Sequence, residues 1–329
     1  MATPAHNIRA QLVDRRERLE GLIGKGPPAP ELDRLLVEVE HALERFAVGT
    51  YGVCETCGDP IEAVQLEADP LSRFCLDHLS PSQAHALQQD LDLAGRVQRT
   101  LLPPGQVVAA GWEMAYRYEP LGAVSGDYCD IVLPLGPDGG LYFLLGDISG
   151  KGVAASMLMA HLHASVRTLL SLELPLSQVV ARANRVFCDS TMSNHYATLV
   201  CARLSTNGEV ELCNAGHCPP LLVHGSDVTP IEATGVPVGL FCVNDYPARR
   251  LTLAPGDALV LYTDGVTEAR NRTDEEYGEA RLASLVAGLS DRSSEAVVAA
   301  CVQAVSIFRG GRTATDDLTV MVVRRVAAN

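Results

Sequence analysis

The segment Leu141-Tyr142-Phe143-Leu144-Leu145-Gly146-Asp147-Ile148-Ser149-Gly150-Lys151-Gly152 places an apolar run directly before an aspartate flanked by glycines. The apolar run has the length of a buried strand, and the glycines allow a sharp backbone turn directly after it. We therefore expect a strand over Leu141–Leu145 that delivers Asp147 to the rim of a hydrophobic core.

Further aspartates lie at strand boundaries: Asp264 after Leu259–Tyr262, Asp316 and Asp317 before Leu318–Val323, and Asp127 within Ser125–Asp130. Several carboxylates at one rim would repel one another unless a cation lay among them, and oxygen-only ligands favour Mg²⁺ or Mn²⁺. The chain has 40 acidic residues, and Asp-Gly is an ordinary turn. The residues alone therefore leave two interpretations open, a metal site and a set of turns.

The surrounding sequence mixes strand and helix patterns without regular βαβ order. Trp112–Tyr118 alternates like a strand, and Asn207-Gly208 between Tyr196–Leu204 and Glu209–Cys213 predicts a hairpin. Helical periodicity marks four longer stretches: Val153–Leu170, Leu176–Phe187, Glu279–Leu289 and Ser294–Phe308. We expect an α+β fold in which helices cover sheets.

The N-terminal part has a helical pattern. Apolar residues share one helical face in two stretches: Ile8, Leu12, Leu19, Leu22 and Ile23, then Leu32, Leu35, Leu36, Val39, Leu43 and Phe46. Gly24–Pro30 breaks the helix between them, which predicts a helical hairpin or two independent amphipathic helices. A further helix is expected from Ser80-Pro81-Ser82-Gln83, where Ser80 can cap it, to Pro103-Pro104.

A metal-ligand pattern lies between these helices. Cys54-Glu55-Thr56-Cys57 is followed after 17 residues by Cys75-Leu76-Asp77-His78. Two residues between ligands let a tight turn aim both side chains at one ion, and two such turns complete a tetrahedral zinc shell. We predict one structural Zn²⁺ on Cys54, Cys57, Cys75 and His78.

Length and charge limit the classes of function. At roughly 100–200 residues per domain, 329 residues predict more than one domain, and we place boundaries at 1–79, 80–102 and 103–329. The net charge of -14 argues against nonspecific nucleic-acid binding, which needs Lys and Arg to neutralise phosphates. No apolar run approaches the roughly 18–20 residues that cross a bilayer, and no secretory signal is seen, so we expect a cytoplasmic protein without membrane contact.

The segment Tyr51-Gly52-Val53-Cys54-Glu55-Thr56-Cys57-Gly58-Asp59-Pro60-Ile61, preceded by the expected hairpin, resembles the DksA/TraR-type zinc fingers over about Ala10–Leu79. That family commonly binds RNA polymerase through its secondary channel. This chain departs from the pattern in two places, because His78 stands where Cys is usual and the hairpin tip carries Lys25 and prolines but no acidic residue. A polymerase contact, dimerisation and sensing are the alternatives for this module.

The chain from about Asp90 to Arg325 resembles the SpoIIE/RsbU-like branch of the PPM-type metal-dependent Ser/Thr phosphatases. Seven motifs occur in that family's order: Arg96–Pro103, Ser125–Tyr128, Gly146–Gly152, Asn214–His217, Gly239–Leu240, Tyr262–Glu268 and Asp316–Thr319. The resemblance implies a β-sandwich of two stacked antiparallel sheets flanked by helices, with a two-metal site at one edge.

By this resemblance Asp147 bridges two Mn²⁺ or Mg²⁺ ions. The main-chain carbonyl of Ile148 binds the first ion, and Asp127 holds that ion directly or through water. Asp264 and Asp316 bind the other ion. Asp127, Asp147, Asp264 and Asp316 thus form the implied catalytic set.

Asp317 is a further candidate ligand, for a third ion or a water. The implied reaction is hydrolysis of phosphoserine or phosphothreonine on a regulatory protein by a water activated between two cations. The usual substrate in this branch is a STAS-type anti-sigma-factor antagonist. We expect a homodimer in which the 80–102 helix is a regulatory linker, and we expect His217 to have a structural role.

The alternative is a zinc-finger adaptor that binds RNA polymerase or another partner and carries an inactive phosphatase scaffold. The two hypotheses differ in whether the metal ligands are complete. All four aspartates of the implied catalytic set are present, which favours the enzyme.

Overall fold

The computed structural model describes residues 4–23, 30–75, 78, 81–133, 140–172, 174–191 and 195–327. The expected breaker at Gly24–Ala29 and the Ser80 cap lie outside these residues. The chain divides into two compact units, Met1–Gln89 and Asp90–Asn329. Among the helices of the described ranges, none combines the length and the apolar character needed to span a membrane.

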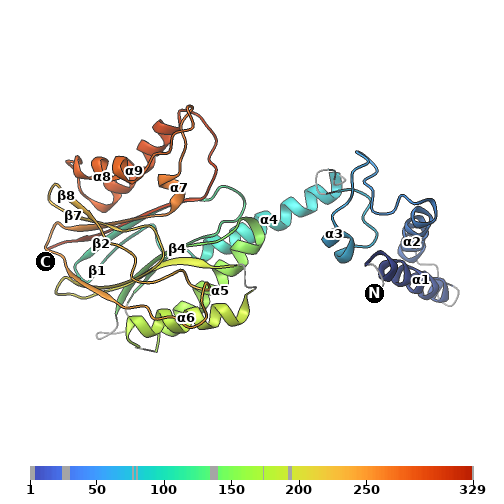
Figure 1. Ribbon diagram of the computed structural model, residues 1–329, viewed down its shortest axis with the longest axis horizontal. Coiled ribbons are helices and arrows are strands. Elements are labelled where there is room, and N and C mark those ends of the chain that lie inside the picture. Colours follow the sequence, from blue (N-terminus) through green and yellow to red (C-terminus); the bar gives the residue numbers. More distant parts are fainter. Residues whose placement is uncertain are drawn as a thin grey trace. The chain divides into compact units, whose positions relative to one another are not determined.

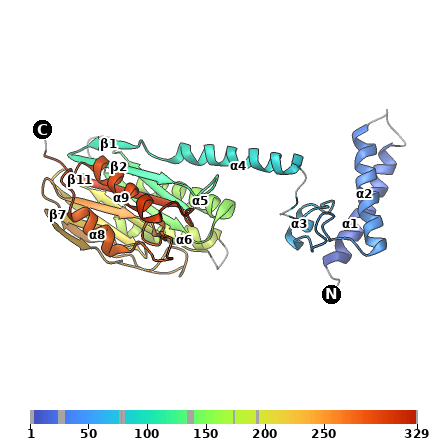
Figure 2. The same cartoon turned by 90° about the horizontal axis from the view of Figure 1, so that it is seen from above.

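The N-terminal unit packs two helices against a small irregular region. Helix α1 (Pro4–Ile23) lies beside α2 (Pro30–Val48), and the short helix α3 (Ala63–Ala68) follows (Figure 2). One buried cluster joins both helices to the cysteine-rich region: Ile8, Leu12, Leu19, Val39, Ala42, Cys54, Ile61, Leu66 and Cys75. The packing confirms the hairpin. Leu22 was expected on the buried face but is exposed, since it lies in the last turn of α1, beyond the packed Leu19.

Two antiparallel sheets stack face to face in the C-terminal unit (Figure 1). The six-stranded sheet has the order β1 (Gln106–Ala109), β2 (Trp112–Glu119), β11 (Leu318–Arg325), β10 (Ala258–Tyr262), β7 (Leu221–His224), β8 (Asp227–Pro230). The five-stranded sheet has the order β3 (Asp127–Val132), β4 (Leu141–Ile148), β5 (Ala197–Leu204), β6 (Glu209–Ala215), β9 (Arg249–Thr252). Trp112 and Met321 from one sheet and Phe143 and Leu212 from the other are fully buried between them.

Helices cover the outer face of each sheet (Figure 1). Helices α5 (Gly152–Leu170) and α6 (Leu176–Ser190) pack on the five-stranded sheet. Helices α8 (Glu279–Ala287) and α9 (Ser294–Arg309) pack on the six-stranded sheet, and the one-turn helix α7 (Asp264–Thr267) follows β10. This arrangement confirms the expected α+β sandwich.

Turn and helix-end patterns in the sequence correctly predicted two features of the fold. Strands β5 and β6 pair antiparallel around the Asn207-Gly208 turn, where Gly208 has a φ of 93° that favours glycine. Helix α4 (Pro81–Leu101) ends two residues before Pro103, because proline cannot continue a helix.

Candidate active site

Two aspartates of the five-stranded sheet face each other across neighbouring strands. Asp127, the first residue of β3, pairs directly with Asp147 near the end of β4. The Asp127 side chain is buried, and its Oδ2 accepts hydrogen bonds from the hydroxyl of Thr263, at 3.1 Å, and from that of Thr319. Thr263 follows β10 and Thr319 lies in β11, so this carboxylate joins the two sheets at one edge.

The six-stranded sheet brings two more carboxylates to that edge. Asp264 directly follows Thr263 and begins α7, and Asp316 lies two residues before β11. Strands β10 and β11 are neighbours, and the Thr263 N–H donates to the Thr319 carbonyl at 3.0 Å. The four aspartates therefore converge from strand ends of both sheets.

Burial and mutual repulsion raise the pKa of three of these carboxyl groups. Burial, followed by the charges of Asp264, Asp316 and Asp317, raises the pKa of Asp147 to about 8. Burial and the Asp147 charge hold the pKa of Asp127 well above its ordinary range, and burial and Asp316 raise the pKa of Asp264. Ionised carboxylates that are largely buried and close to one another need a compensating cation, and an oxygen-only donor set fits Mg²⁺ or Mn²⁺.

A glycine keeps an oxygen-lined space open beside Asp147. A Cβ atom added to Gly126 would lie 3.2 Å from the Ile148 carbonyl oxygen and 3.3 Å from Asp147 Oδ1. Both oxygens therefore border one small volume, which a larger side chain would fill. A carboxylate and a main-chain carbonyl are hard oxygen donors that suit a divalent cation.

Asp317 holds the loop that precedes β3. Its Oδ1 accepts the Leu121 N–H at 2.6 Å, and its Oδ2 accepts the Gly126 N–H at 2.9 Å. Both oxygens are thus used to order the backbone next to Asp127. A role for Asp317 as a metal ligand stays a prediction.

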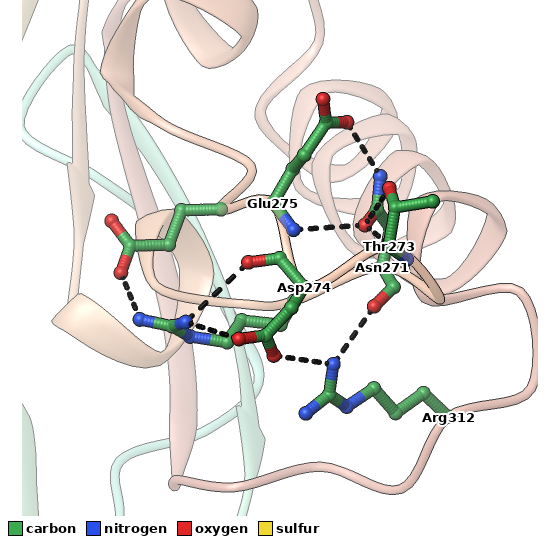
Figure 3. Close-up of polar contacts among 7 residues, drawn as sticks. Asn271, Thr273, Asp274, Glu275 and Arg312 are labelled. Atoms are coloured by element: carbon green, nitrogen blue, oxygen red, sulfur yellow. Dashed lines mark hydrogen bonds and ion pairs between the residues drawn. The ribbon is translucent and has the colours of Figure 1, made fainter.

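Two basic side chains, those of Lys151 and Arg312, hold the loop that carries Asp316. The Lys151 ammonium lies 2.8 Å from Asp316 Oδ2 and donates to the Thr315 carbonyl at 2.7 Å. Arg312, earlier in this loop, donates to the Asn271 carbonyl at 2.9 Å and to Asp274 Oδ1 at 2.7 Å (Figure 3).

Arg312 contacts a turn at Asn271–Glu275, and hydrogen bonds with the Asn271 side chain stabilise this turn. Asn271 Oδ1 accepts the N–H groups of Thr273 and Glu275 at 2.9 and 3.0 Å (Figure 3). Figure 3 shows that the segment after α7 and the segment before β11 share one polar network. This network braces the backbone that leads to Asp316.

His217 lies beneath the carboxylates and between the sheets. Its Nδ1 is 2.8 Å from the hydroxyl of Thr198, which pairs with Asp147 across β4 and β5. Burial lowers the pKa of His217 to about 4, and a contact with the Tyr262 backbone acts in the opposite direction. The Asn214 Oδ1 accepts the His217 N–H, and the Asn214 Nδ2 donates to the His217 carbonyl. These contacts support a structural role, because a buried neutral imidazole is a poor proton donor at neutral pH.

A second group of potential metal ligands lies in the N-terminal unit. Cys54, Cys57, Cys75 and His78 each offer one ligand atom, and these atoms lie within 4.8 Å of one another. Cys57 Sγ and Cys75 Sγ are 3.8 Å apart, and Cys75 Sγ is 3.2 Å from His78 Nδ1. Tetrahedral zinc with Zn–S bonds of about 2.3 Å and Zn–N bonds of about 2.0–2.1 Å needs ligand spacings of roughly 3.5–3.8 Å. The Cys57–Cys75 spacing meets this requirement, and the Cys75–His78 spacing is shorter than it. Three thiols and one imidazole are a ligand set that suits a closed zinc site.

Comparison with known proteins finds a family model that matches part of each unit. The family model described as Stage II sporulation protein E (SpoIIE) matches residues 137–326, more than half of the chain. The chain belongs to the SpoIIE family. The prokaryotic dksA/traR C4-type zinc finger matches residues 49–77, so both resemblances seen in the sequence are confirmed. His78, the predicted fourth zinc ligand in this SpoIIE-family chain, lies one residue beyond that match.

Relatives of this SpoIIE-family chain include named phosphatases. Protein IcfG of Synechocystis sp. is 27% identical over 266 residues, which cover 72% of this chain and 41% of IcfG. The phosphoserine phosphatase RsbU of Bacillus subtilis is 27% identical over 187 residues, which cover 56% of this chain and 55% of RsbU. The chain thus spans about half the length of these curated relatives.

Solved structures share the SpoIIE-family sandwich. The RsbU and RsbW domains of Rv1364c from Mycobacterium tuberculosis match with a TM-score of 0.58 at 29% identity, over 69% of this chain and 62% of that one. The SiaA-PP2C domain of Pseudomonas aeruginosa matches with a TM-score of 0.64 over 75% of this chain and 99% of that domain. At 17% identity the second match shows the fold alone. The C-terminal unit has a PP2C-like fold.

Sequence patterns did not single out the residues that support the aspartates. Thr263, Thr319 and Thr198 lie inside motifs or strands, but only their cross-strand partners reveal their contacts with the site. Arg312 has no motif signal at all. Asp147, Asp264 and Asp316 did carry a signal, because each follows or precedes an apolar run.

Proposed function

We propose that this protein is a metal-dependent serine/threonine protein phosphatase that hydrolyses phosphoserine or phosphothreonine on a regulatory protein. The convergence of Asp127, Asp147, Asp264 and Asp316 at one edge of the sandwich carries the proposal. Membership in the SpoIIE family supports it, as does similarity to RsbU, which is named a phosphoserine phosphatase.

The residues of the site take distinct roles in this proposal. Asp147 would hold both Mn²⁺ or Mg²⁺ ions. The Ile148 carbonyl and Asp127 would hold the first ion, beside the space that Gly126 leaves open. Asp264 and Asp316 would hold the second ion. When bound, the ions supply a water of lowered pKa as nucleophile and neutralise charge on the phosphoryl oxygens.

The proposed substrate is a phosphorylated STAS-type anti-sigma-factor antagonist. Two relatives, RsbU and RsbP of Bacillus subtilis, are named phosphoserine phosphatases, which supports phosphoserine as the reacting group. We assign residues 1–79 to a zinc-stabilised regulatory module, 80–102 to a linking helix and 103–329 to the phosphatase domain, and we propose that the protein acts as a homodimer.

Hydrolysis of para-nitrophenyl phosphate with Mn²⁺ tests the proposal. Asp264→Asn should lower kcat at least 100-fold, because it removes a charged ligand of the second ion. Asp227→Asn, an exposed aspartate on β8, is the matched control and should keep the wild-type rate. Equal rates in wild type and Asp264→Asn would support the adaptor with an inactive scaffold instead.

A further inference from the structure

A cavity of about 330 Å³ lies directly beside the proposed metal centre. Asp316 and Asp317 belong to its lining, so the cavity borders one proposed ligand of the second ion. The remaining walls come from α4, from the loop between β2 and β3, and from the start of α5. Its volume lies at the lower end of the roughly 300–1,000 Å³ typical of sites for small ligands.

Among the described residues that line this cavity, Lys151 is the one cation. Its ammonium has three N–H donors. Two of them are used by Asp316 and by the Thr315 carbonyl, at 2.8 and 2.7 Å. Lys151 therefore places a positive charge and a remaining donor next to a proposed ligand of the second ion, which is suitable for a phosphoryl oxygen.

Part of the cavity lining is apolar. Leu91, Leu121, Val124 and Val153 belong to it, and Leu121 and Val153 are 46% and 48% exposed. Large apolar side chains left this exposed beside a catalytic centre are a favourable surface for an apolar group of a ligand. The wall is also fixed in place, because Asp317 accepts the backbone N–H of Leu121 at 2.6 Å.

Resting on the proposed phosphatase function, we propose that this cavity binds the phosphoserine of the substrate protein together with an apolar side chain directly adjacent to it. The phosphoryl group lies at the Lys151 end, beside Asp316. The adjacent side chain packs against Leu121 and Val153. A single cavity thus binds both the phosphate and the side chain of one neighbouring residue. The enzyme is therefore selective for phosphoserines that have an apolar neighbour.

Two phosphoserine peptides test this selectivity. They are identical except that the residues on both sides of the phosphoserine are leucine in one and serine in the other. With Mn²⁺, the wild-type protein should show a kcat/KM at least tenfold higher for the leucine peptide, mainly through KM. Leu121→Ser should abolish the preference by lowering kcat/KM for the leucine peptide to the value of the serine peptide, because it removes the apolar side chain from the cavity wall.

A matched variant controls for the loss of any exposed apolar residue. Ile307→Ser removes an exposed isoleucine on α9, far from the cavity lining, and should keep the full preference. Lys151→Gln should weaken inhibition by inorganic phosphate at least fivefold and lower kcat/KM for both peptides alike.

A binding measurement separates this inference from the proposed activity. Fluorescence anisotropy of the two labelled peptides with Asp264→Asn requires no turnover and should show the same leucine preference. If no variant hydrolyses any substrate but the binding preference persists, the phosphatase assignment fails and the cavity assignment stands. If para-nitrophenyl phosphate is hydrolysed but the two peptides bind and react equally, the cavity assignment is overturned.

Discussion

The side-chain amide of Gln98 forms two hydrogen bonds with the backbone of Ser125. Its Oε1 accepts the Ser125 N–H at 3.0 Å, and its Nε2 donates to the Ser125 carbonyl at 2.6 Å. Gln98 is buried near the end of α4, and Ser125 lies two residues before Asp127. Gly95 completes the contact, because a Cβ there would lie 2.1 Å from the Ala123 carbonyl oxygen. Helix α4 is thus attached to the loop that enters the carboxylate cluster.

Loss of this attachment should weaken metal binding. Gln98→Leu leaves a buried N–H and a buried carbonyl without partners, which costs about 1–3 kcal/mol per group at most, and it frees the loop before Asp127. We expect Mn²⁺ affinity, measured by titration calorimetry, to fall at least threefold. Gln106→Leu, at an exposed position on β1, should leave the affinity unchanged. Unaltered affinity in Gln98→Leu would show that the loop orders itself without α4.

His217 and Thr198 should act on the metal centre as one unit. The 2.8 Å contact between them lies directly behind Asp147, so either change shifts the strand position that presents this carboxylate. We expect His217→Gln and Thr198→Val each to weaken Mn²⁺ binding about three- to tenfold, with the double variant no worse than the more affected single one. His224→Gln, on the exposed end of β7, is the control. If the losses of Mn²⁺ affinity in the two single variants added fully in the double variant, His217 and Thr198 would not act as one unit.

The carboxylate cluster should make the protein less stable as pH rises, when no divalent cation is added. Asp147 has an ordinary pKa of 3.8 and a pKa of about 8 when folded. Between these values the folded protein holds a proton that the unfolded chain has released, so raising the pH favours unfolding. The pKa of His217 falls from 6.5 to about 4 on folding. This shift makes the stability rise with pH, but only below pH 6.5.

The thermal unfolding midpoint of the C-terminal unit should therefore fall by a few degrees between pH 6.5 and 8. Asp147→Asn should flatten this slope, and saturating Mn²⁺ should remove it, since metal binding displaces the proton. A midpoint that is constant or rises over this window in the wild-type protein would mean that these carboxyl groups are ionised without a cation.

Removal of one zinc ligand should affect only the N-terminal unit. Cys57→Ser should reduce the zinc content, measured by atomic absorption, from about one ion per chain to nearly none, because structural zinc sites fold together with their metal. Para-nitrophenyl phosphate hydrolysis should stay within twofold of wild type, since the metal centre lies within the C-terminal unit. Cys242→Ser, an exposed cysteine of the C-terminal unit, should keep the zinc. His78→Cys should also keep it, because thiolate is an equally good ligand.

The sequence predicted those features that depend on local pattern. Apolar runs mark β4, β10 and β11, and the aspartates at their ends are visible because the apolar pattern stops there. By contrast, the sequence of Arg249–Thr252 has no strand pattern. This segment is the strand β9 because it pairs with β6 in the folded chain. Supporting contacts were also invisible, because Gln98 acts on a backbone 27 residues away and Thr319 on a carboxylate 192 residues away. Such partners are set by the tertiary fold and not by neighbouring residues.

Anomalous scattering from crystals grown with Mn²⁺ would show whether the aspartates hold two ions. We expect two manganese peaks per chain within coordination distance of Asp147, one also at the Ile148 carbonyl and the other at Asp264 and Asp316. Well-ordered aspartates with no manganese peak among them would contradict the two-ion site.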